Sequence, residues 1–208
     1  MVQALQPTTN NGHSEGAVVI ERKARERLYS PLRPPCSLYV LLEGRVSVAR
    51  LTRDGKRLVT EVLDAGDVFG DLSFSGVGSD SEIAEALTDC RAFVVDSRRA
   101  KDLIASDPEL AVRLLSAVAN RLNSMCGRLE EFAFSPVETR VASAVLRIAG
   151  STGRTAPVSH QFVAEMAGTY RETATRALKG LQMREMLRLG RCAIEIEDPH
   201  ALAAVATT

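Results

Sequence analysis

Aromatic residues are scarce in this sequence: tryptophan is absent, and phenylalanine and tyrosine together make up 4% of the 208 residues. We therefore expect an aliphatic core. Neither sign of charge dominates, since 26 basic and 26 acidic residues cancel, which over the whole chain argues against a nucleic-acid binder. With 45% hydrophobic and 25% charged residues, the composition is that of a globular protein of one large or two small domains, and disordered or collagen-like chains are excluded.

Cysteine and histidine are too few and too scattered to suggest a metal site. The four cysteines, Cys36, Cys90, Cys126 and Cys192, form no CxxC pair, so we expect reduced thiols rather than a zinc site or a thioredoxin-type dithiol. No histidine occurs at residues 14–159, which leaves a metal-dependent enzyme without its usual ligand there. No metal, cofactor or catalytic residue is predicted.

Long apolar runs are missing as well. The first 16 residues lack the basic start and the apolar run of a signal peptide, and no stretch of about 18 apolar residues occurs anywhere. The sequence therefore predicts a cytoplasmic protein with no membrane partner. Residues 1–16, rich in Gln, Asn, Thr, Ser and Gly, are expected to form a flexible tail.

The segment 17–98 consists of short runs of strand-forming residues separated by glycine-containing turns. The runs cover residues 38–42, 46–51, 58–63, 83–87 and 91–95. Asp54-Gly55, between the second and third runs, is a dipeptide favoured in tight hairpins. Many short strands without an intervening long helix predict an antiparallel sandwich or barrel.

A long helix is expected from Pro108 to about Phe132, where apolar residues recur at alternating spacings of three and four. This heptad-like stripe consists of Leu115, Val118, Leu122, Met125, Leu129 and Phe132. Such a stripe is typical either of the buried side of a surface helix or of a dimer interface. Pro136 ends the helix, and another is expected over residues 137–149.

Two short helices joined by a turn come next. Ser159 is a good N-cap for a helix over residues 160–167, Gly168-Thr169 forms the turn, and a second helix covers residues 170–183. One face of the second helix carries Ala174, Ala177, Leu178 and Leu181, and the other carries Arg171, Glu172, Thr175, Arg176 and Lys179. A hairpin over residues 187–196 follows, turning at Gly190, and completes the layout of a winged helix-turn-helix.

Arg171 is the residue that points from this layout to DNA. Thr169 and Glu172 form a T-x-x-E capping box, which by itself would explain Glu172. A cation in the first turn of a helix, however, is disfavoured by the helix dipole. In the major groove, an arginine at this position can donate two hydrogen bonds to guanine, worth roughly 1–3 kcal/mol of base discrimination. We therefore predict that Arg171 reads a base.

The segment 159–181, SHQFVAEMAGTYRETATRALKGL, closely resembles the helix-turn-helix of the CRP/FNR family of bacterial transcription regulators, including its R-E-T-x-x-R core. Residues 38–46, 54–56 and 65–72 are similar to the β-roll of that family, and residues 108–132 to its dimerisation helix. The resemblance implies an α+β fold. Its parts would be an antiparallel β-roll of the cyclic-nucleotide-binding jelly-roll type at 17–98, a dimerisation helix region at 99–134 and a winged helix-turn-helix at 136–208.

The resemblance also implies roles for individual residues. Arg171, Glu172 and Arg176 would read bases in a palindromic operator with TGTGA-like half-sites. Phosphate contacts would come from Ser159, Gln161, Thr169, Thr173, Gly190 and Arg191, with Thr175 and Lys179 as further candidates. A homodimer formed through the stripe from Leu115 to Phe132 would bind double-stranded DNA and contact RNA polymerase, as an activator. A small-molecule-binding β-roll protein without DNA binding is the rival of a different class.

The resemblance is weakest at the effector pocket. Nucleotide-binding members have Gly-Glu-Leu and then Arg-Ser-Ala, whose Arg pairs with the cyclic phosphate. This chain has Gly70-Asp71-Leu72 and Asp80-Ser81, with Met125-Cys126 where the catabolite activator has Thr-Ser, and no Arg or Lys between Arg57 and Arg91. Because a carboxylate repels a phosphate, we predict a degenerate pocket that binds neither cAMP nor cGMP.

Other forms of gating stay open at this point. The N-terminal cysteine cluster of oxygen-sensing members is missing, since no cysteine precedes Cys36. Cys126 is the thiol best placed for redox gating, although a small apolar filler is the simpler role for it. A cyclic-nucleotide-gated regulator and a regulator without any effector are both compatible with the remaining residues.

The zero net charge is an average over two unlike parts. Residues 150–192 hold seven basic and three acidic residues, a net charge of +4, whereas residues 1–134 hold 17 basic and 19 acidic residues, a net charge of −2. The positive excess thus lies on the predicted DNA-binding segment, and a dimer would double it.

Overall fold

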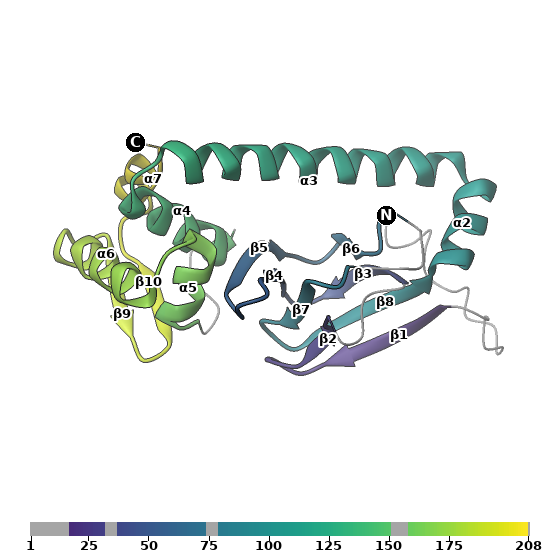
Figure 1. Cartoon of the computed structure of the whole chain (residues 1–208), viewed down its shortest axis with the longest axis horizontal. Coiled ribbons are helices and arrows are strands. Elements are labelled where there is room, and N and C mark those ends of the chain that lie inside the picture. The colour runs from purple at the N-terminus through teal and green to yellow at the C-terminus, as the bar shows by residue number, and fades with distance from the viewer. Residues whose placement is uncertain (1–16, 32–36, 74–78, 151–157, 208) are drawn as a thin grey trace. The chain divides into compact units, whose positions relative to one another are not determined.

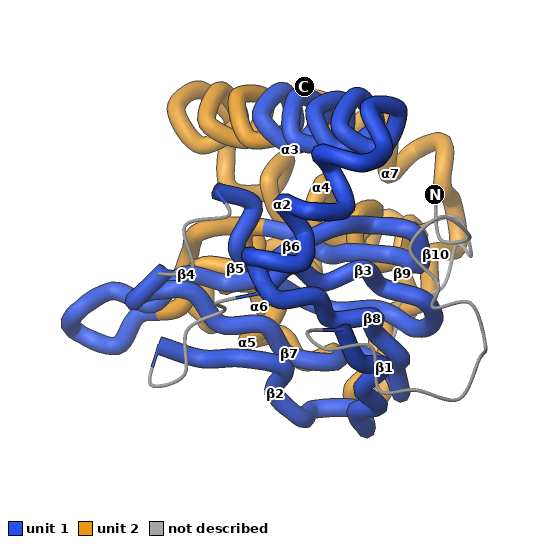
Figure 2. The backbone as a smooth tube through the Cα atoms, turned by 90° about the vertical axis from the view of Figure 1, so that its right-hand side faces the viewer, with its two compact units in different colours: residues 1–56, 61–124 blue, residues 57–60, 125–208 orange. Residues whose placement is uncertain are grey.

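The computed structural model describes residues 17–31, 37–73, 79–150 and 158–207. The chain divides into two compact units: unit 1 comprises residues 1–56 and 61–124, and unit 2 comprises residues 57–60 and 125–208 (Figure 2). The predicted tail at 1–16, the loop at 151–157 and Cys36 lie outside the described residues.

Short antiparallel strands make up most of the N-terminal half, as the alternation of apolar runs and turns predicts. They are β1 (Ala17–Arg22), β2 (Arg27–Tyr29), β3 (Ser37–Glu43), β4 (Val46–Leu51), β5 (Arg57–Leu63), β6 (Val68–Gly70), β7 (Glu82–Ala86) and β8 (Cys90–Asp96). These strands form two sheets, in the orders β1-β8-β3-β6 and β2-β7-β4-β5 (Figure 1).

Two glycine turns shape the roll: one joins β4 to its neighbour β5, and the other leads from β3 of one sheet to β4 of the other sheet. Gly55, in the predicted Asp54-Gly55 turn, has a φ of 80°, and the amide of Thr52 donates to the carbonyl of Lys56 across it at 2.9 Å. Gly44, between β3 and β4, has a φ of 83°, and a Cβ there would lie 2.2 Å from the carbonyl oxygen of Asp89. Only glycine fits this second turn without moving the backbone.

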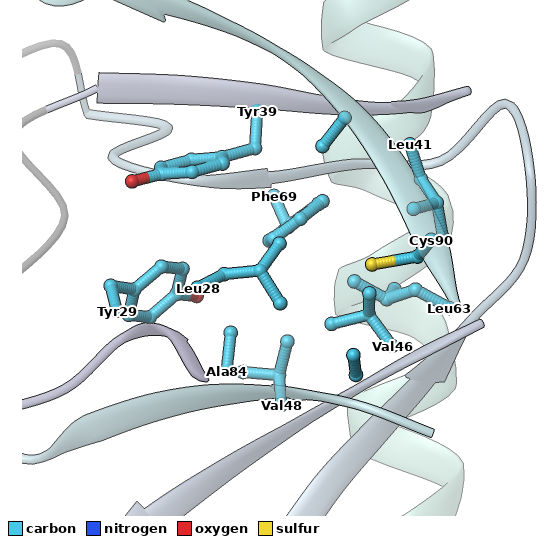
Figure 3. Packing of buried hydrophobic residues seen from close by; sticks show 12 residues of the cluster. Leu28, Tyr29, Tyr39, Leu41, Val46, Val48, Leu63, Phe69, Ala84 and Cys90 are labelled. Atoms are coloured by element: carbon cyan, nitrogen blue, oxygen red, sulfur yellow. The ribbon is translucent and has the colours of Figure 1, made fainter. Parts of the chain in front are cut away.

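The core of the roll lies between the two sheets. It contains Leu28, Tyr29, Tyr39, Leu41, Val46, Val48, Leu63, Phe69, Ala84, Ala86, Cys90 and Ala92 (Figure 3). The expectation of an aliphatic core is only partly right, because the rings of Tyr29, Tyr39 and Phe69 pack together with centroids 5.1–6.2 Å apart. These three of the nine aromatic residues bury their large apolar areas at one place in the roll.

The other face of the first sheet is covered by helices. Val40, Phe93 and Val95 pack there against α2 (Ser97–Ser106) and the first turns of α3 (Pro108–Phe134). Asp96 caps α2 by accepting a hydrogen bond from the amide of Arg99 at 2.8 Å. The long helix α3 thus begins as part of the roll and ends in unit 2.

Unit 2 contains a small helical core and a hairpin. Its elements are α4 (Val137–Ala149), α5 (His160–Ala167), α6 (Arg171–Met183), β9 (Leu187–Gly190), β10 (Ala193–Ile196) and α7 (Pro199–Ala206). Helix α7 was not among the predicted elements, although Asp198-Pro199 is a typical start signal for a helix. Asp198 accepts a hydrogen bond from the amide of Ala201 at 2.9 Å, and Leu202 is fully buried. None of the described helices is long and apolar enough to cross a membrane.

Candidate nucleic-acid interface

The helix-turn-helix forms where the sequence predicts it. Ser159 caps α5 by accepting from the amide of Phe162 at 3.2 Å. Gly168 ends α5 in the left-handed conformation, with a φ of 59°, and the amide of Thr169 donates to the carbonyl of Ala164 at 3.0 Å. This local chemistry fixes the angle at which α6 leaves α5.

The two faces of α6 differ as predicted. Ala174, Leu178 and Leu181 are completely buried, whereas Arg171, Glu172, Arg176 and Lys179 are exposed. Within the described part of the chain, these four charged side chains make no hydrogen bond or ion pair. The outer face of α6 therefore presents two guanidinium groups, one carboxylate and one ammonium group to solvent, all available to an external partner.

The predicted capping box is wrong. The N-cap of α6 is Tyr170 rather than Thr169, and no side chain caps the helix. The first-turn amides of α6 and the carboxylate of Glu172 are therefore not hydrogen-bonded to each other in a capping box. Tyr170, 71% exposed at the leading end of α6, was missed by the sequence analysis, although an aromatic residue beside the R-E-T core is a visible signal.

The predicted phosphate-binding residues lie around this leading end and on the wing. Thr169 and Thr173 are half-buried and Arg191 is exposed. The side chain of Gln161 already donates to Glu165 at 3.0 Å. Gly190 and Arg191 stand at the tip of the β9–β10 hairpin, where Gly190 pairs with Ala193.

One histidine lies within the interface. His160 Nδ1 is 3.1 Å from Thr175 Oγ1, so the predicted phosphate contact Thr175 has an internal partner. Partial burial lowers the pKa of His160, and the charges of Arg171 and Lys179 lower it further. The pKa of this imidazole is thus sensitive to any anion that neutralises those two cations.

The predicted dimer stripe on α3 is exposed over most of its length. The exposed fractions are 69% for Leu115, 40% for Val118, 61% for Leu122, 40% for Met125 and 69% for Leu129. Phe132 departs from the stripe: its ring packs within unit 2 against Gly168, where a Cβ would lie 2.8 Å from Phe132 Cε1. Five of the six predicted positions therefore form a continuous apolar face open to solvent.

A second stripe of α3 is buried, and it contains arginines. Leu110 and Leu114 are followed seven and fourteen residues after Leu114 by Arg121 and Arg128, which places all four on one side of the helix. Nε of Arg121 is 2.5 Å from Oε1 of Glu61 on β5. Arg128 is 8% exposed. Along this second stripe, two buried leucines are followed by the partly buried Arg121 and the buried Arg128, whereas the leucines of the first stripe are exposed.

The first half of the predicted effector pocket, Gly70-Asp71-Leu72, turns inward. Asp71 is only 4% exposed, and its two carboxylate oxygens accept hydrogen bonds from Ser73 at 2.6 Å and Ser97 at 3.0 Å. A ribose hydroxyl would have to compete with both serines. Both carboxylate oxygens of Asp71 thus already have hydrogen-bond donors within the protein.

The second half of the predicted pocket is acidic in sequence, but the fold brings the guanidinium group of Arg50 to it. Asp80 is exposed, while Ser81 accepts a hydrogen bond from Arg50 of β4 at 2.7 Å. Arg50 was not predicted near this half because it precedes the segment 57–91. The pairing of β4 with β7 brings it opposite Glu82. Glu82 itself accepts from the hydroxyl of Tyr29 at 2.5 Å, and burial followed by this carboxylate raises the pKa of Tyr29 far above its ordinary value.

The described cysteines are separate from one another. Cys90 is buried, and burial raises the pKa of its thiol, whereas Cys126 on α3 and Cys192 on the wing are exposed. Among the described residues, no group of three or more His, Cys, Asp and Glu side chains is arranged to hold a metal ion.

Comparison with known proteins gives a consistent family. Residues 19–107 match the model of the cyclic nucleotide-binding domain, and residues 139–205 match that of the Crp-like helix-turn-helix domain. The chain is 29% identical to a CRP-like cAMP-activated global transcriptional regulator of Mycobacterium tuberculosis, covering 97% of this chain and 93% of that protein. It is also 29% identical to the cyclic AMP receptor protein of Thermus thermophilus, covering 82% and 79%.

Solved structures share the fold. FixK2 from Bradyrhizobium japonicum superposes with a TM-score of 0.75 at 23% identity, covering 91% of this chain and 96% of that one. A CRP/FNR-family transcriptional regulator from Eubacterium rectale gives a TM-score of 0.78 at 20% identity, covering 94% and 92%. With its β-roll, long helix and helix-turn-helix all in place, the chain belongs to the CRP/FNR family of DNA-binding transcription regulators.

Proposed function

We propose that this regulator binds a palindromic operator with TGTGA-like half-sites, and that Arg171, Glu172 and Arg176 read its bases. The contrast between the two faces of α6 carries the proposal: one face holds the fully buried Ala174, Leu178 and Leu181, and the other holds these three exposed side chains without internal partners among the described residues. A guanidinium without an internal partner can donate to O6 and N7 of guanine, and a carboxylate can accept from N4 of cytosine.

Phosphate contacts would set the position of α6 in the groove. The half-buried hydroxyls at the start of α6, the ammonium group of Lys179 and the wing tip at Gly190 and Arg191 surround the base-reading residues in sequence and in unit 2. Contacts of this kind orient the protein without reading sequence. They also make the affinity for DNA depend on salt.

We propose that the protein acts as a homodimer through α3. Exposed leucines at 61–69% on one stripe and buried arginines on another are the reverse of what a monomeric helix requires. The heptad spacing of the exposed stripe suits the same stripe of a second copy. Two copies would place two α6 helices on half-sites about one helical turn apart.

DNA binding is proposed to need no cyclic nucleotide, in contrast to what the names of the relatives from M. tuberculosis and T. thermophilus say of those proteins. Asp71 is bonded to two serines, and Arg121 is paired with Glu61. Both pairs satisfy, within the protein, groups that would otherwise be free for a ligand. An acidic residue at position 80 opposes a cyclic phosphate.

Arg50 supports a second candidate, a nucleotide-gated regulator. Its guanidinium bonds to Ser81 and would supply the positive charge that the sequence around Asp80 lacks. A redox-gated regulator would instead use Cys126, which is exposed next to Met125 of the apolar stripe. Calorimetry with cyclic nucleotides, and operator affinity measured after thiol oxidation, separate these two candidates from the effector-free one.

Contact with RNA polymerase, as an activator acting in the cytoplasm, completes the proposal. The relative from M. tuberculosis is named a global transcriptional regulator, and a dimer bound upstream of a promoter would act on the polymerase beside it. In vitro transcription from a promoter carrying the selected operator tests the sign: we expect more transcript with the protein than without it, and less transcript would make it a repressor.

The operator is tested by selecting bound DNA from a random library with effector-free protein. We expect an enriched palindrome with TGTGA-like halves, and Arg171→Ala should relax the selection at one base pair of each half. Lys179→Ala is the matched control, because loss of a phosphate contact should lower the salt slope by about one without changing the selected sequence. Failure to enrich any sequence would overturn the proposed function.

The dimer is tested by placing a charge in the stripe. Leu122→Glu should convert the protein to a monomer in sedimentation equilibrium, whereas Arg113→Glu, on the same helix outside the stripe, should leave the dimer intact. A short bismaleimide should cross-link two copies through Cys126 more readily than through Cys192 on the wing. A wild-type protein that sediments as a monomer would contradict the proposal.

Effector independence is tested by calorimetry with cAMP and cGMP. We expect no heat of binding at micromolar ligand and the same operator affinity with and without each nucleotide. Micromolar binding that is lost in Arg50→Ala would establish the nucleotide-gated candidate instead. Operator affinity that changes on thiol oxidation, but not in Cys126→Ser, would establish the redox-gated one.

A further inference from the structure

The C-terminal end of α5 is held by three side chains, Arg128 and Phe132 of α3 and Arg140 of α4, which we call the α5 clasp. Arg128 donates to the carbonyl of Met166 at 3.1 Å, and Arg140 donates through Nε to the carbonyl of Ala167 at 3.0 Å. These carbonyls lie in the last turn of α5, where the helix itself supplies no donors and the dipole favours a cation.

Arg128 also binds the strand β5. Its guanidinium donates to the carbonyl of Val59 at 2.8 Å and to that of Thr60. With 8% of the residue exposed, the charge is compensated by backbone oxygens of two separate elements. Arginine suits this role because its planar group has five donors fixed in direction.

Phe132 supports the clasp from the middle. The guanidinium carbons of Arg128 and Arg140 lie 5.5 Å and 5.9 Å from the centre of its ring, within the range of a cation–π interaction. The edge of the same ring lies against Gly168, leaving no space for a Cβ. The clasp therefore touches the last turn of α5 and the glycine that starts the turn to α6.

We propose that Arg128 is a positioning residue for DNA recognition, which ties the end of α5, and thereby the start of α6, to β5 and α3. This inference rests on the proposed function, since its effect is read through operator binding. Arg171 follows Met166 by only five residues, so a small rotation at the end of α5 displaces the base-reading side chains. A misplacement of about 1 Å is enough to weaken directed hydrogen bonds.

The test compares Arg128→Met and Arg128→Lys with Arg113→Met, which removes an exposed arginine whose ion pair is with Glu109 on the same helix. For Arg128→Met, the dissociation constant for the selected operator should rise about tenfold to a hundredfold, because a charged group loses several hydrogen bonds. The constant for random DNA and its salt slope should stay unchanged. Arg128→Lys should recover only part of the affinity, and Arg113→Met should match wild type.

Hydrogen exchange provides a readout without DNA. The amides of Gly168 and Thr169 both donate to the carbonyl of Ala164, and their protection should fall in Arg128→Met but not in Arg113→Met. Should Arg128→Met fail to fold, Phe132→Leu keeps the arginine and should show the same selective loss of operator affinity and protection. Folded variants with wild-type operator affinity and wild-type protection, or with equal losses on operator and random DNA, would overturn the inference. Wild-type protein that selects no operator would overturn the proposed function. In that case, unchanged amide protection in the folded variants would by itself show that the clasp does not hold the end of α5.

Discussion

The arginines of α6 and those of α3 have opposite surroundings. Arg171 and Arg176 are exposed and bond to no other described residue, whereas Arg121 and Arg128 lie on the buried side of α3 and bind a carboxylate and backbone carbonyls. A guanidinium brought into the interior must find partners, because desolvation of the charge costs several kcal/mol. The exposed pair has no such compensation within the described part of the protein and is available to DNA.

The helix α3 carries two stripes of heptad-like spacing, and they face in different directions. The leucine stripe of α3 faces solvent, and the stripe that contains Leu110, Leu114, Arg121 and Arg128 faces the protein. The stripe that faces the protein thus changes from leucine to arginine along α3, whereas the leucines of the other stripe are exposed. Such an arrangement is stable only if another surface covers the leucines, which is the basis of the proposed dimer.

The largest effect on stability is expected from Arg121→Met. The substitution removes the ion pair between Arg121 and Glu61, whose side chain is 13% exposed, and breaking a buried pair costs about 3–5 kcal/mol. Chemical denaturation followed by circular dichroism measures the loss. The double variant Arg121→Met with Glu61→Leu should recover most of it, and a single variant as stable as wild type would show that the pair is not effectively buried.

Arg171→Ala should have the opposite profile. Its stability should match that of wild type, because the side chain makes no bond within the described part of the protein. Its operator affinity should fall by roughly 1–3 kcal/mol, the value of a bidentate contact to guanine. Fluorescence anisotropy on operator and random DNA measures both affinities, and an equal loss on the two would reassign Arg171 to a phosphate.

The same residues show which features of the structure could be predicted from the sequence. The helix-turn-helix, the wing and the exposed face of α6 follow from local signals, namely a serine cap, a glycine turn and 3.6-residue periodicity, and the structure confirms the elements. The capping box failed because two adjacent residues, Thr169 and Tyr170, compete for one N-cap position, and side-chain type alone does not decide the competition.

The contacts of the arginines were beyond sequence reasoning for a different reason. Arg50 reaches Ser81, and Arg128 reaches Val59, across 31 and 69 residues of chain. Such pairs depend on sheet register and on the packing of α3, which no window of neighbouring residues contains. The periodicity that identified the leucine stripe was equally present for the arginine stripe, but arginine is not expected at a buried heptad position.

A pH titration of stability tests the lowered pKa of His160, to which the exposed Arg171 contributes. The pKa of His160 is lowered in the folded protein. The unfolded chain therefore binds more protons than the folded protein once the pH falls to about 6.5, the ordinary pKa of histidine. Stability should therefore fall as the pH drops from 7 toward the lowered pKa of His160. Denaturation midpoints of wild type and His160→Gln measure the effect.

Bound DNA should reverse that trend. The negative charge of DNA opposes the positive charges of Arg171 and Lys179, two of the causes of the lowered pKa of His160, so binding should be accompanied by proton uptake and the operator affinity should rise as the pH falls. His160→Gln should remove this component. If both proteins show the same pH dependence of binding, Arg171 and Lys179 remain uncompensated near His160 in the complex.

The smallest effects are expected at two helical glycines, one beside each group of arginines. A Cβ at Gly127 on α3 or at Gly180 on α6 would meet no atom within 4 Å, so Gly127→Ala and Gly180→Ala should each raise the free energy of unfolding by about 0.5–1 kcal/mol. Gly127 precedes Arg128, and Gly180 lies four residues after Arg176, on the side of α6 that faces outward. We expect unchanged operator affinity for Gly127→Ala, because its methyl group enters open space. A loss of affinity confined to Gly180→Ala would show that DNA approaches the α6 backbone at this glycine, and would extend the recognition surface one turn beyond Arg176.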